Sequence, residues 1–318
     1  MKILITGAAG FIGYHLTRSF LEDGYEVLGV DIINDYYDPN LKHARLEKLK
    51  LYDNFKFEIV DIADRDLITN CFQSFKPNKV VNLAAQAGVR YSIENPYAYL
   101  DSNLIGFINI IELCRHNDVD GFIYASSSSV YGENKKIPFS VQDRVDKPIA
   151  LYGATKRANE LIAYSYSSLY DLHTTGLRFF TVYGPWGRPD MAMFIFTKNI
   201  LEGTPIPVFN NGKMKRDFTF IDDIISGTRS SIDKNYKCEV FNLGNHKNED
   251  LLYMIDIIES ELGKKAIIDF MPMQPGDVKE SFADIKYSKE KLDFIPKTKI
   301  NEGIPKFIHW YKNYYSLK

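Results

Sequence analysis

Short apolar runs alternate with longer amphipathic stretches through the first 180 residues. The runs are as short as buried strands, and the stretches between them have helical spacing of apolar positions. The expected strands span residues 3–5, 26–30, 55–60 and 79–83. The expected helices span residues 11–21, 64–75, 96–116 and 151–170. This alternation predicts an α/β protein with a Rossmann-type doubly wound parallel sheet.

The pattern changes beyond residue 180, where Pro, Gly and Asn-Gly turn signals become frequent. Helical periodicity returns at residues 222–233, 250–262 and 301–315, and the last stretch is aromatic-rich and should pack its apolar face onto the body. We therefore predict a first domain of residues 1–180, with later returns around 217–243. A smaller C-terminal lobe of residues 181–318 would bind substrate.

A glycine triplet follows the first expected strand at once. Gly7 permits a tight turn, Gly10 lets the backbone approach a pyrophosphate, and Gly13 lets the helix pack close to the strand. The N-terminus of the next helix would face the phosphates. The second strand ends at Asp31, where a carboxylate binds ribose hydroxyls and repels a 2′-phosphate. We expect NAD rather than NADP; a plain turn and an exposed strand-end Asp are the alternatives.

A serine cluster, Ser126–Ser129, precedes the pair Tyr152 and Lys156. Residues four apart on a helix face the same side, where the ammonium can lower the pKa of the phenol. Such a tyrosine is a usable base for a sugar hydroxyl, and a serine hydroxyl can share the proton. An exposed face of an ordinary helix is the alternative for this spacing on its own.

Composition narrows the classes of function. The 39 basic and 41 acidic residues nearly balance and form no basic stripe, so we expect no nucleic-acid partner. The apolar runs are too short for a membrane span, and Met1 adjoins the first strand, which leaves no room for a signal peptide. Cys71, Cys114 and Cys238 cannot all pair, which is typical of a reduced, cytoplasmic protein. The six histidines form no ligand cluster, so we expect no metal.

The charged stretch 42–50 is expected to be a solvated helix face, or else to touch the adenosine side of NAD.

Together these residues resemble the extended short-chain dehydrogenase/reductase superfamily. Segments 177–185 (LRFFTVYGP) and 216–223 (RDFTFIDD) resemble its nucleotide-sugar branch. Segments 34–38 (NDYYD), 84–92 (AAQAGVRYS) and 184–192 (GPWGRPDMA) resemble the UDP-glucuronate 4-epimerases. Two positions depart from these relatives. Ile32 stands where an Asn usually follows the ribose acid, and Gln274 stands where many UDP-galactose epimerases have a second phosphate-binding Arg.

The resemblance implies a role for each matching residue. Tyr152 would be the acid/base at the sugar O4, Lys156 would tune it and bind the nicotinamide ribose, and Ser127 would bond O4. Tightly bound NAD would contact Gly7, Ala9, Gly10, Phe11, Ile12, Gly13, Asp31, Asn34, Asp61, Ile62, Ala84, Ala85, Gln86, Asn103, Tyr152 and Lys156. The UDP-sugar would contact Arg90, Ser127, Ser128, Ser129, Thr181, Arg188, Val208, Phe209, Arg216 and Asp277.

The implied reaction is C4 epimerisation of UDP-glucuronate to UDP-galacturonate, through a 4-keto intermediate that rotates and is reduced again. Relatives that decarboxylate or dehydrate have an acidic residue where this chain has Ser128 or Ser129, so simple epimerisation is favoured. These serines and Arg188 could hold the substrate carboxylate. Alternatively, the serines only pack at a strand end, and Arg188 caps a helix or pairs with Asp190.

Three rival functions share most of these residues. One is a 4-epimerase of UDP-N-acetylglucosamine or UDP-glucose, which differs only in the sugar pocket. The second is a UDP-glucuronate decarboxylase. The third is a non-catalytic NAD sensor or scaffold, which would not need Ser127, Tyr152 and Lys156 together. The resemblance also implies a homodimer formed by helices 96–116 and 151–170.

Overall fold

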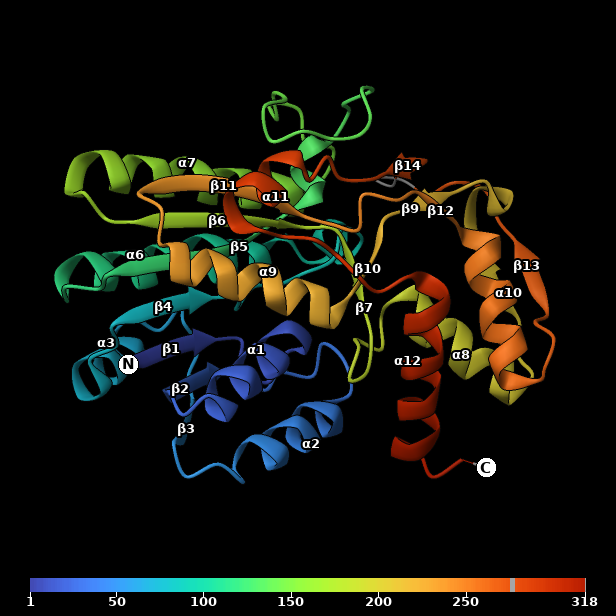
Figure 1. Cartoon of the computed structure of the whole chain (residues 1–318), viewed down its shortest axis with the longest axis horizontal. Coiled ribbons are helices and arrows are strands. Elements are labelled where there is room, and N and C mark those ends of the chain that lie inside the picture. The colour runs from blue at the N-terminus through green and yellow to red at the C-terminus, as the bar shows by residue number, and fades with distance from the viewer. Residues whose placement is uncertain (275–277, 318) are drawn as a thin grey trace.

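A seven-stranded parallel sheet forms the larger part of the computed structural model, which describes residues 1–274 and 278–317 (Figure 1). Its strand order is β11-β6-β5-β4-β1-β2-β3. The strands are β1 (Lys2–Thr6), β2 (Glu26–Asp31), β3 (Phe55–Ile59), β4 (Lys79–Asn82), β5 (Gly121–Ser127), β6 (Thr174–Phe179) and β11 (Cys238–Leu243). The predicted Rossmann-type fold is confirmed. The order reverses between β1 and β4, and such a switch point is where ligands bind in open α/β sheets.

Helices cover both faces of this sheet. One face packs against α1 (Phe11–Glu22), α2 (Pro39–Leu49) and α9 (Ile221–Lys234), and the other against α3 (Arg65–Phe75), α6 (Gly106–His116) and α7 (Leu151–Tyr170). Side chains alternate along a strand, so Ile3 and Ile5 join the core on one face while Leu4 joins the core on the other. All three are fully buried, which explains why β1 is apolar throughout rather than alternating.

Most of the remaining elements form a smaller lobe, at the right of Figure 1. Its helices are α8 (Ala192–Glu202), α10 (Leu251–Leu262) and α12 (Ile300–Tyr314), whereas α11 (Lys286–Leu292) packs against α9 and β11 of the larger part. Its short strands are β7 (Thr181–Tyr183) with β10 (Phe218–Phe220), β8 (Ile206–Val208) with β13 (Ile268–Phe270), and β9 (Lys215–Arg216) with β12 (Glu249–Asp250) and β14 (Glu280–Ser281). As predicted, the last helix buries its apolar face, including Ile304, Phe307 and Tyr311. The division of the chain at residue 180 stays a prediction.

The stretch predicted as one helix over residues 96–116 is three consecutive elements. These are α5 (Pro96–Leu100), the π-helix η1 (Asp101–Ile105) and α6. A π-turn inside a helix is frequent near functional sites because it redirects side chains. The short helices α4 (Tyr91–Glu94), η2 (Ser128–Tyr131) and η3 (Phe209–Gly212) complete the described elements.

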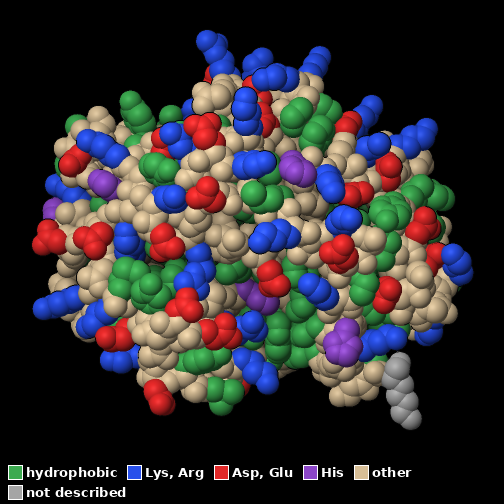
Figure 2. Space-filling view, viewed as in Figure 1, with side chains coloured by type: hydrophobic (Ala, Val, Ile, Leu, Met, Phe, Trp, Pro, Cys, Tyr) green, Lys and Arg blue, Asp and Glu red, His purple; other side chains and the backbone are tan. Residues whose placement is uncertain are grey.

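The charged stretch 42–50 lies in and just after α2 and differs from the main expectation for it. Lys42 is only 5% exposed and Arg45 is fully buried, whereas His43, Glu47, Lys48 and Lys50 are exposed. Only part of the stretch is therefore a solvated face. Elsewhere, acidic and basic side chains intermingle over the face shown in Figure 2. No helix within residues 1–274 and 278–317 is long and apolar enough to cross a membrane.

Candidate active site

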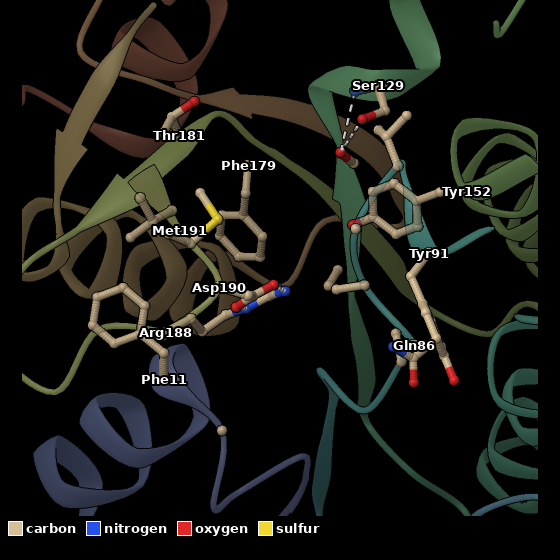
Figure 3. A pocket seen from close by; sticks show the side chains of 18 of the residues that line it. Phe11, Gln86, Tyr91, Ser129, Tyr152, Phe179, Thr181, Arg188, Asp190 and Met191 are labelled. Atoms are coloured by element: carbon tan, nitrogen blue, oxygen red, sulfur yellow. Dashed lines mark hydrogen bonds and ion pairs between the residues drawn. The ribbon is translucent and has the colours of Figure 1, made fainter. Parts of the chain in front are cut away.

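A cavity of about 840 Å³ opens beyond the carboxyl ends of β1 and β4 and extends into the smaller lobe. In Figure 3, Gln86 and Tyr152 line one wall, and Thr181, Arg188 and Met191 line the other. The cavity therefore lies at the switch point of the sheet, between the sheet's loops and the second lobe. Most of the residues that were predicted from the sequence to bind cofactor or substrate line this cavity.

The glycine turn forms one end of this cavity. Gly7 has φ +71°, and a Cβ atom there would lie 2.8 Å from the Ala84 nitrogen. A Cβ atom on Gly13 would lie 2.0 Å from the Gly7 oxygen, so only glycine fits where the helix meets the turn. No side chain caps the N-terminus of α1, and its first turn has no acidic residue. These N–H groups are available to a phosphate, as a bound dinucleotide requires.

Polar side chains gather where the adenosine ribose of a dinucleotide would lie. The Asp31 carboxylate accepts hydrogen bonds from the N–H groups of Ala9 and Ile33, both at 3.1 Å. The Asn34 side-chain oxygen accepts a 2.5 Å bond from Lys42 Nζ. Burial lowers the pKa of Lys42. Lys42 and Ile32 line the cavity too, and contact of stretch 42–50 with the adenosine side of NAD stays a prediction.

Most nominated residues line the cavity, namely Gly7, Gly10, Phe11, Ile12, Gly13, Asp31, Asn34, Asp61, Ile62, Ala84, Ala85, Gln86, Arg90, Ser127, Ser128, Ser129, Tyr152, Lys156, Thr181, Arg188, Phe209 and Arg216. Ala9, Asn103 and Val208 do not, because their side chains are buried in the protein. Asn103 lies in η1, where its amide bonds both the N–H (2.9 Å) and the carbonyl (3.0 Å) of Gln86. Its amide also donates a 3.1 Å bond to Thr155 Oγ1, next to Lys156, so Asn103 positions Gln86 and α7 rather than lining the cavity. Asp277 lies outside the described residues.

The nominated catalytic residues meet at the end of β5. Ser127 is the last residue of that strand, Tyr152 is in the first turn of α7, and the Lys156 ammonium donates a 2.9 Å bond to the Ala125 carbonyl. Burial lowers the pKa of Lys156 to about 8. Burial raises the pKa of Tyr152, while a hydrogen bond with Ser127 and the charge of Arg188 lower it.

The groups that lower the pKa of Tyr152 differ from the expectation, which was that the Lys156 ammonium lowers it. The sequence places both residues on one side of the helix, but it does not show that the Lys156 ammonium reaches back to β5. In the structure, the groups that favour the phenolate of Tyr152 are Ser127 and Arg188.

The serine cluster has a turn geometry of its own. Ser127 Oγ accepts a 3.1 Å bond from the Ser129 N–H and donates a 3.2 Å bond to Ser129 Oγ. This contact is drawn as dashed lines in Figure 3. Ser128 and Ser129 line the cavity and place no carboxylate in it. The two serines thus shape the strand end and face the cavity at once.

Arg188 forms the ion pair that the sequence offered as the alternative to substrate binding. Its Nε and Nη2 atoms contact the two Asp190 oxygens at 3.0 and 2.5 Å. Burial disfavours the charged guanidinium, but the charge of Asp190, its hydrogen bond and the nearby Tyr36 and Tyr37 together outweigh this effect and raise the pKa of Arg188. Tyr36 donates a 3.3 Å bond to the same carboxylate. The cation in the cavity is therefore held in place before any substrate carboxylate arrives.

A row of tyrosines borders the site, and most of them were not predicted from the sequence as site residues. Tyr152 packs edge-to-face against Tyr99 at 6.1 Å, Tyr99 lies 6.3 Å from Tyr91, and Tyr91 lies 5.0 Å from Tyr36, measured between ring centroids. Tyr99 donates bonds to the carbonyls of Ala87 and Gly88. The segments 34–38 and 84–92 indicated Tyr36 and Tyr91 only through resemblance. Tyr99, in a helix, has no local signal.

The far end of the cavity belongs to the smaller lobe. Arg216 in β9 donates bonds to the carbonyls of Lys215 (2.9 Å) and Lys279 (3.2 Å). The Arg90 guanidinium lies 5.4 Å from the centre of the Phe209 ring, which brings the loop after β4 against the second lobe. Within residues 1–274 and 278–317, no group of three or more His, Cys, Asp or Glu side chains could hold a metal.

Comparison with known proteins identifies the class of protein that this fold and site define. Residues 3–244 match the NAD dependent epimerase/dehydratase family, and the chain belongs to that family. It is 49% identical to Protein CapI of Staphylococcus aureus, with 99% of each chain covered. It is 45% identical to UDP-glucuronate 4-epimerase 4 of Arabidopsis thaliana, over 99% of this chain and 76% of the relative.

The structure resembles a solved member of the same family. The UDP-glucuronic acid 4-epimerase of Bacillus cereus, in complex with UDP-glucuronic acid and NAD, superposes with a TM-score of 0.93 at 35% identity. The match covers 99% of this chain and 100% of that one.

Proposed function

We propose that this protein epimerises UDP-glucuronate to UDP-galacturonate at C4, with tightly bound NAD as its cofactor. One observation carries the proposal. The same cavity contains an uncapped glycine turn for a dinucleotide, a tyrosine whose pKa is lowered by Ser127, and a cation with two serine hydroxyls suited to a carboxylate. Relatives that are 45% and 35% identical are named UDP-glucuronate 4-epimerases, which supports this choice of sugar.

Tyr152 and Ser127 would act on the O4 hydroxyl of the sugar. The Tyr152 phenolate would take the O4 proton, and Ser127 would hold the same oxygen. NAD, when bound, accepts the hydride from C4 and later returns it to the opposite face. Because the pKa of Lys156 is about 8, its side chain is mainly an ammonium at neutral pH. The ammonium can thus favour the ionised state of Tyr152 once the site is filled.

The sugar side of the site would prevent loss of the carboxylate. A 4-keto uronic acid is a β-keto acid and can lose CO₂. Ser128 and Ser129 offer hydroxyl donors to the carboxylate, whereas a glutamate at either position would repel it. Arg188 would supply the opposite charge. With serine rather than an acidic residue at positions 128 and 129 to move protons at C5, the intermediate is expected to rotate and be reduced rather than to decarboxylate.

The nucleotide end would stay fixed during this rotation. We propose that residues 1–180 bind NAD and that residues 181–318 hold mainly the UDP-sugar. Phe209 and Arg216 line the far end of the cavity, and Arg90 closes on Phe209 from the other side. Asp277, which matches an acid near the UDP ribose, would assist there. The sugar ring can then turn about its pyrophosphate linkage without leaving the site.

The first experiment is direct. The purified protein is incubated with UDP-glucuronate, without added NAD, and the products are identified by proton NMR. We expect UDP-galacturonate, which would also show that NAD co-purifies. A UDP-pentose would instead indicate decarboxylation. If nothing changes even after NAD is added, while UDP-N-acetylglucosamine or UDP-glucose is converted, the proposed sugar is wrong.

We further propose a cytoplasmic homodimer. Free thiols at Cys71, Cys114 and Cys238 support a reducing compartment. The predicted dimer helices expose large apolar side chains, with Tyr97 74%, Tyr164 66% and Leu161 53% accessible. Such apolar exposure is typical of a subunit interface. Light scattering should give the mass of a dimer for the wild type and of a monomer for Tyr164→Glu. A monomeric wild type would contradict the proposal.

A further inference from the structure

Arg45 of α2 joins three segments that are far apart in the sequence. Its side chain is fully buried. Nη1 donates to the Ala9 carbonyl at 2.8 Å and to the Tyr37 hydroxyl at 2.9 Å, and Nη2 donates to the Trp186 carbonyl at 2.6 Å and more weakly to that of Gly187 at 3.3 Å. One guanidinium therefore connects the glycine turn to the loop that leads to Arg188.

The acceptors of Arg45 are unusual for a buried cation. Among the described residues, no carboxylate lies within ion-pair distance of its guanidinium, so its partners are carbonyl and hydroxyl oxygens. Burying a charge against neutral groups costs free energy of folding. A protein with an apolar side chain of similar volume at such a position is often no less stable than one with the charged residue. Fold stability alone does not account for an arginine at this position. Its planar fork, however, fixes several carbonyls at once.

The loop that contains Trp186 has a backbone conformation that such hydrogen bonds can stabilise. Trp186 has φ +62°, a left-handed conformation that is uncommon for a bulky residue. Its carbonyl accepts the 2.6 Å bond from Arg45, and its ring packs against Tyr14 and Trp310. Arg188 follows two residues later and faces the sugar end of the cavity. A shift of the Trp186 turn would therefore move the guanidinium of Arg188.

We propose that Arg45 is a positioning residue that couples the NAD-binding turn to the Arg188 loop, so that NAD and the sugar carboxylate hold each other in place. This inference rests on the proposed function. At the cofactor end, Arg45 fixes the carbonyl of Ala9, whose N–H bonds the ribose-binding acid Asp31. At the sugar end, it fixes the backbone from which Arg188 extends. A ligand that orders one end also orders the other, and such coupling is reciprocal.

The test compares how two substrates slow the release of NAD. The rate of NAD loss from the holoenzyme is followed by trapping the free cofactor with a second dehydrogenase. It is measured alone, with UDP-glucose and with UDP-glucuronate. In the wild type, we expect UDP-glucuronate to slow release ~5- to 10-fold more than UDP-glucose, because only the former has the carboxylate. In Arg45→Met this difference should fall below ~2-fold, and in Arg45→Lys it should be intermediate.

The matched control is Arg229→Met. Arg229 also joins α1 to another helix, through the Ser19 carbonyl and Asp23, but at the end of α1 away from the glycine turn. This variant should lose thermal stability yet keep the wild-type difference. If Arg45→Met also keeps the difference and only its melting temperature falls, Arg45 is merely structural and the proposal is wrong. NAD release requires no turnover, so these results are distinct from a failure of the NMR assay.

Discussion

The two ends of the cavity are built in different ways. At the cofactor end, the phosphate site consists of backbone: glycines that no other residue could replace, and uncapped N–H groups at the start of α1. The sugar end consists of side chains: the Arg188–Asp190 pair, the serines of η2 and a row of tyrosines. A backbone cradle is fixed by the fold, which suits a cofactor that stays bound. Side-chain partners can be exchanged, which suits a sugar that must turn over and bind twice.

Tyr152 lies where the two ends meet, and its removal should have the largest effect. Tyr152→Phe removes the hydroxyl that takes the O4 proton and leaves the ring packed against Tyr99. We expect turnover to fall by ~10²-fold or more. The NAD content of the purified protein, read from its absorbance, should not change because the backbone cradle is intact. Tyr253→Phe, on an exposed face of α10, is the control. Near-normal turnover of Tyr152→Phe would remove Tyr152 from the mechanism.

The charge of Lys156 gives the next effect. Burial lowers its pKa to about 8, so the ammonium predominates below that pH and is lost as the pH rises through it. If the ammonium supports the Tyr152 phenolate, turnover should decline above pH ~8. Lys156→Met should be ~10-fold or more slower at pH 7, and its profile should lack this alkaline decline. A decline of the same midpoint in the variant would assign it to another group.

The cofactor end was largely predictable from the sequence, because local patterns determine it. The spacing of Gly7, Gly10 and Gly13 and the strand end at Asp31 are signals within a short segment.

The predicted helix over residues 151–170 has the bounds of α7. The predicted helices at 222–233, 250–262 and 301–315 differ from the observed ones by no more than one residue at either end.

The sugar end was less predictable, because tertiary contacts determine it. The buried role of Arg45 depends on a loop far along the chain, because the Trp186 carbonyl, 141 residues later, accepts its hydrogen bond. A π-turn directs Asn103 to Gln86 rather than into the cavity, and helical periodicity does not reveal it. Val208 lies in a strand next to lining residues but points into the core.

Arg188 tests whether side chains select the sugar. Arg188→Ala removes the cation opposite the serines and should raise the KM for UDP-glucuronate ~10-fold, with a smaller change for UDP-glucose, because only the uronate has a carboxylate to pair. Steady-state kinetics on both substrates give the comparison. Arg115→Ala, which breaks the ion pair with Glu112 in α6, is the control. Equal losses on both substrates would show that Arg188 does not bind the carboxylate.

Replacing Asp190 tests the same selection between UDP-glucuronate and UDP-glucose and has the smallest expected effect. In Asp190→Asn, one oxygen remains to hold Arg188 and to accept the Tyr36 hydroxyl, but the negative charge that competes with the substrate is gone. Partly exposed ion pairs contribute little, so the KM for UDP-glucuronate should fall only ~3-fold, with no gain for UDP-glucose. The double variant with Arg188→Ala should lose this gain. If the single variant instead binds UDP-glucuronate more weakly, Asp190 orients Arg188 rather than competing for it. The sugar end would then be as fixed before binding as the cofactor end.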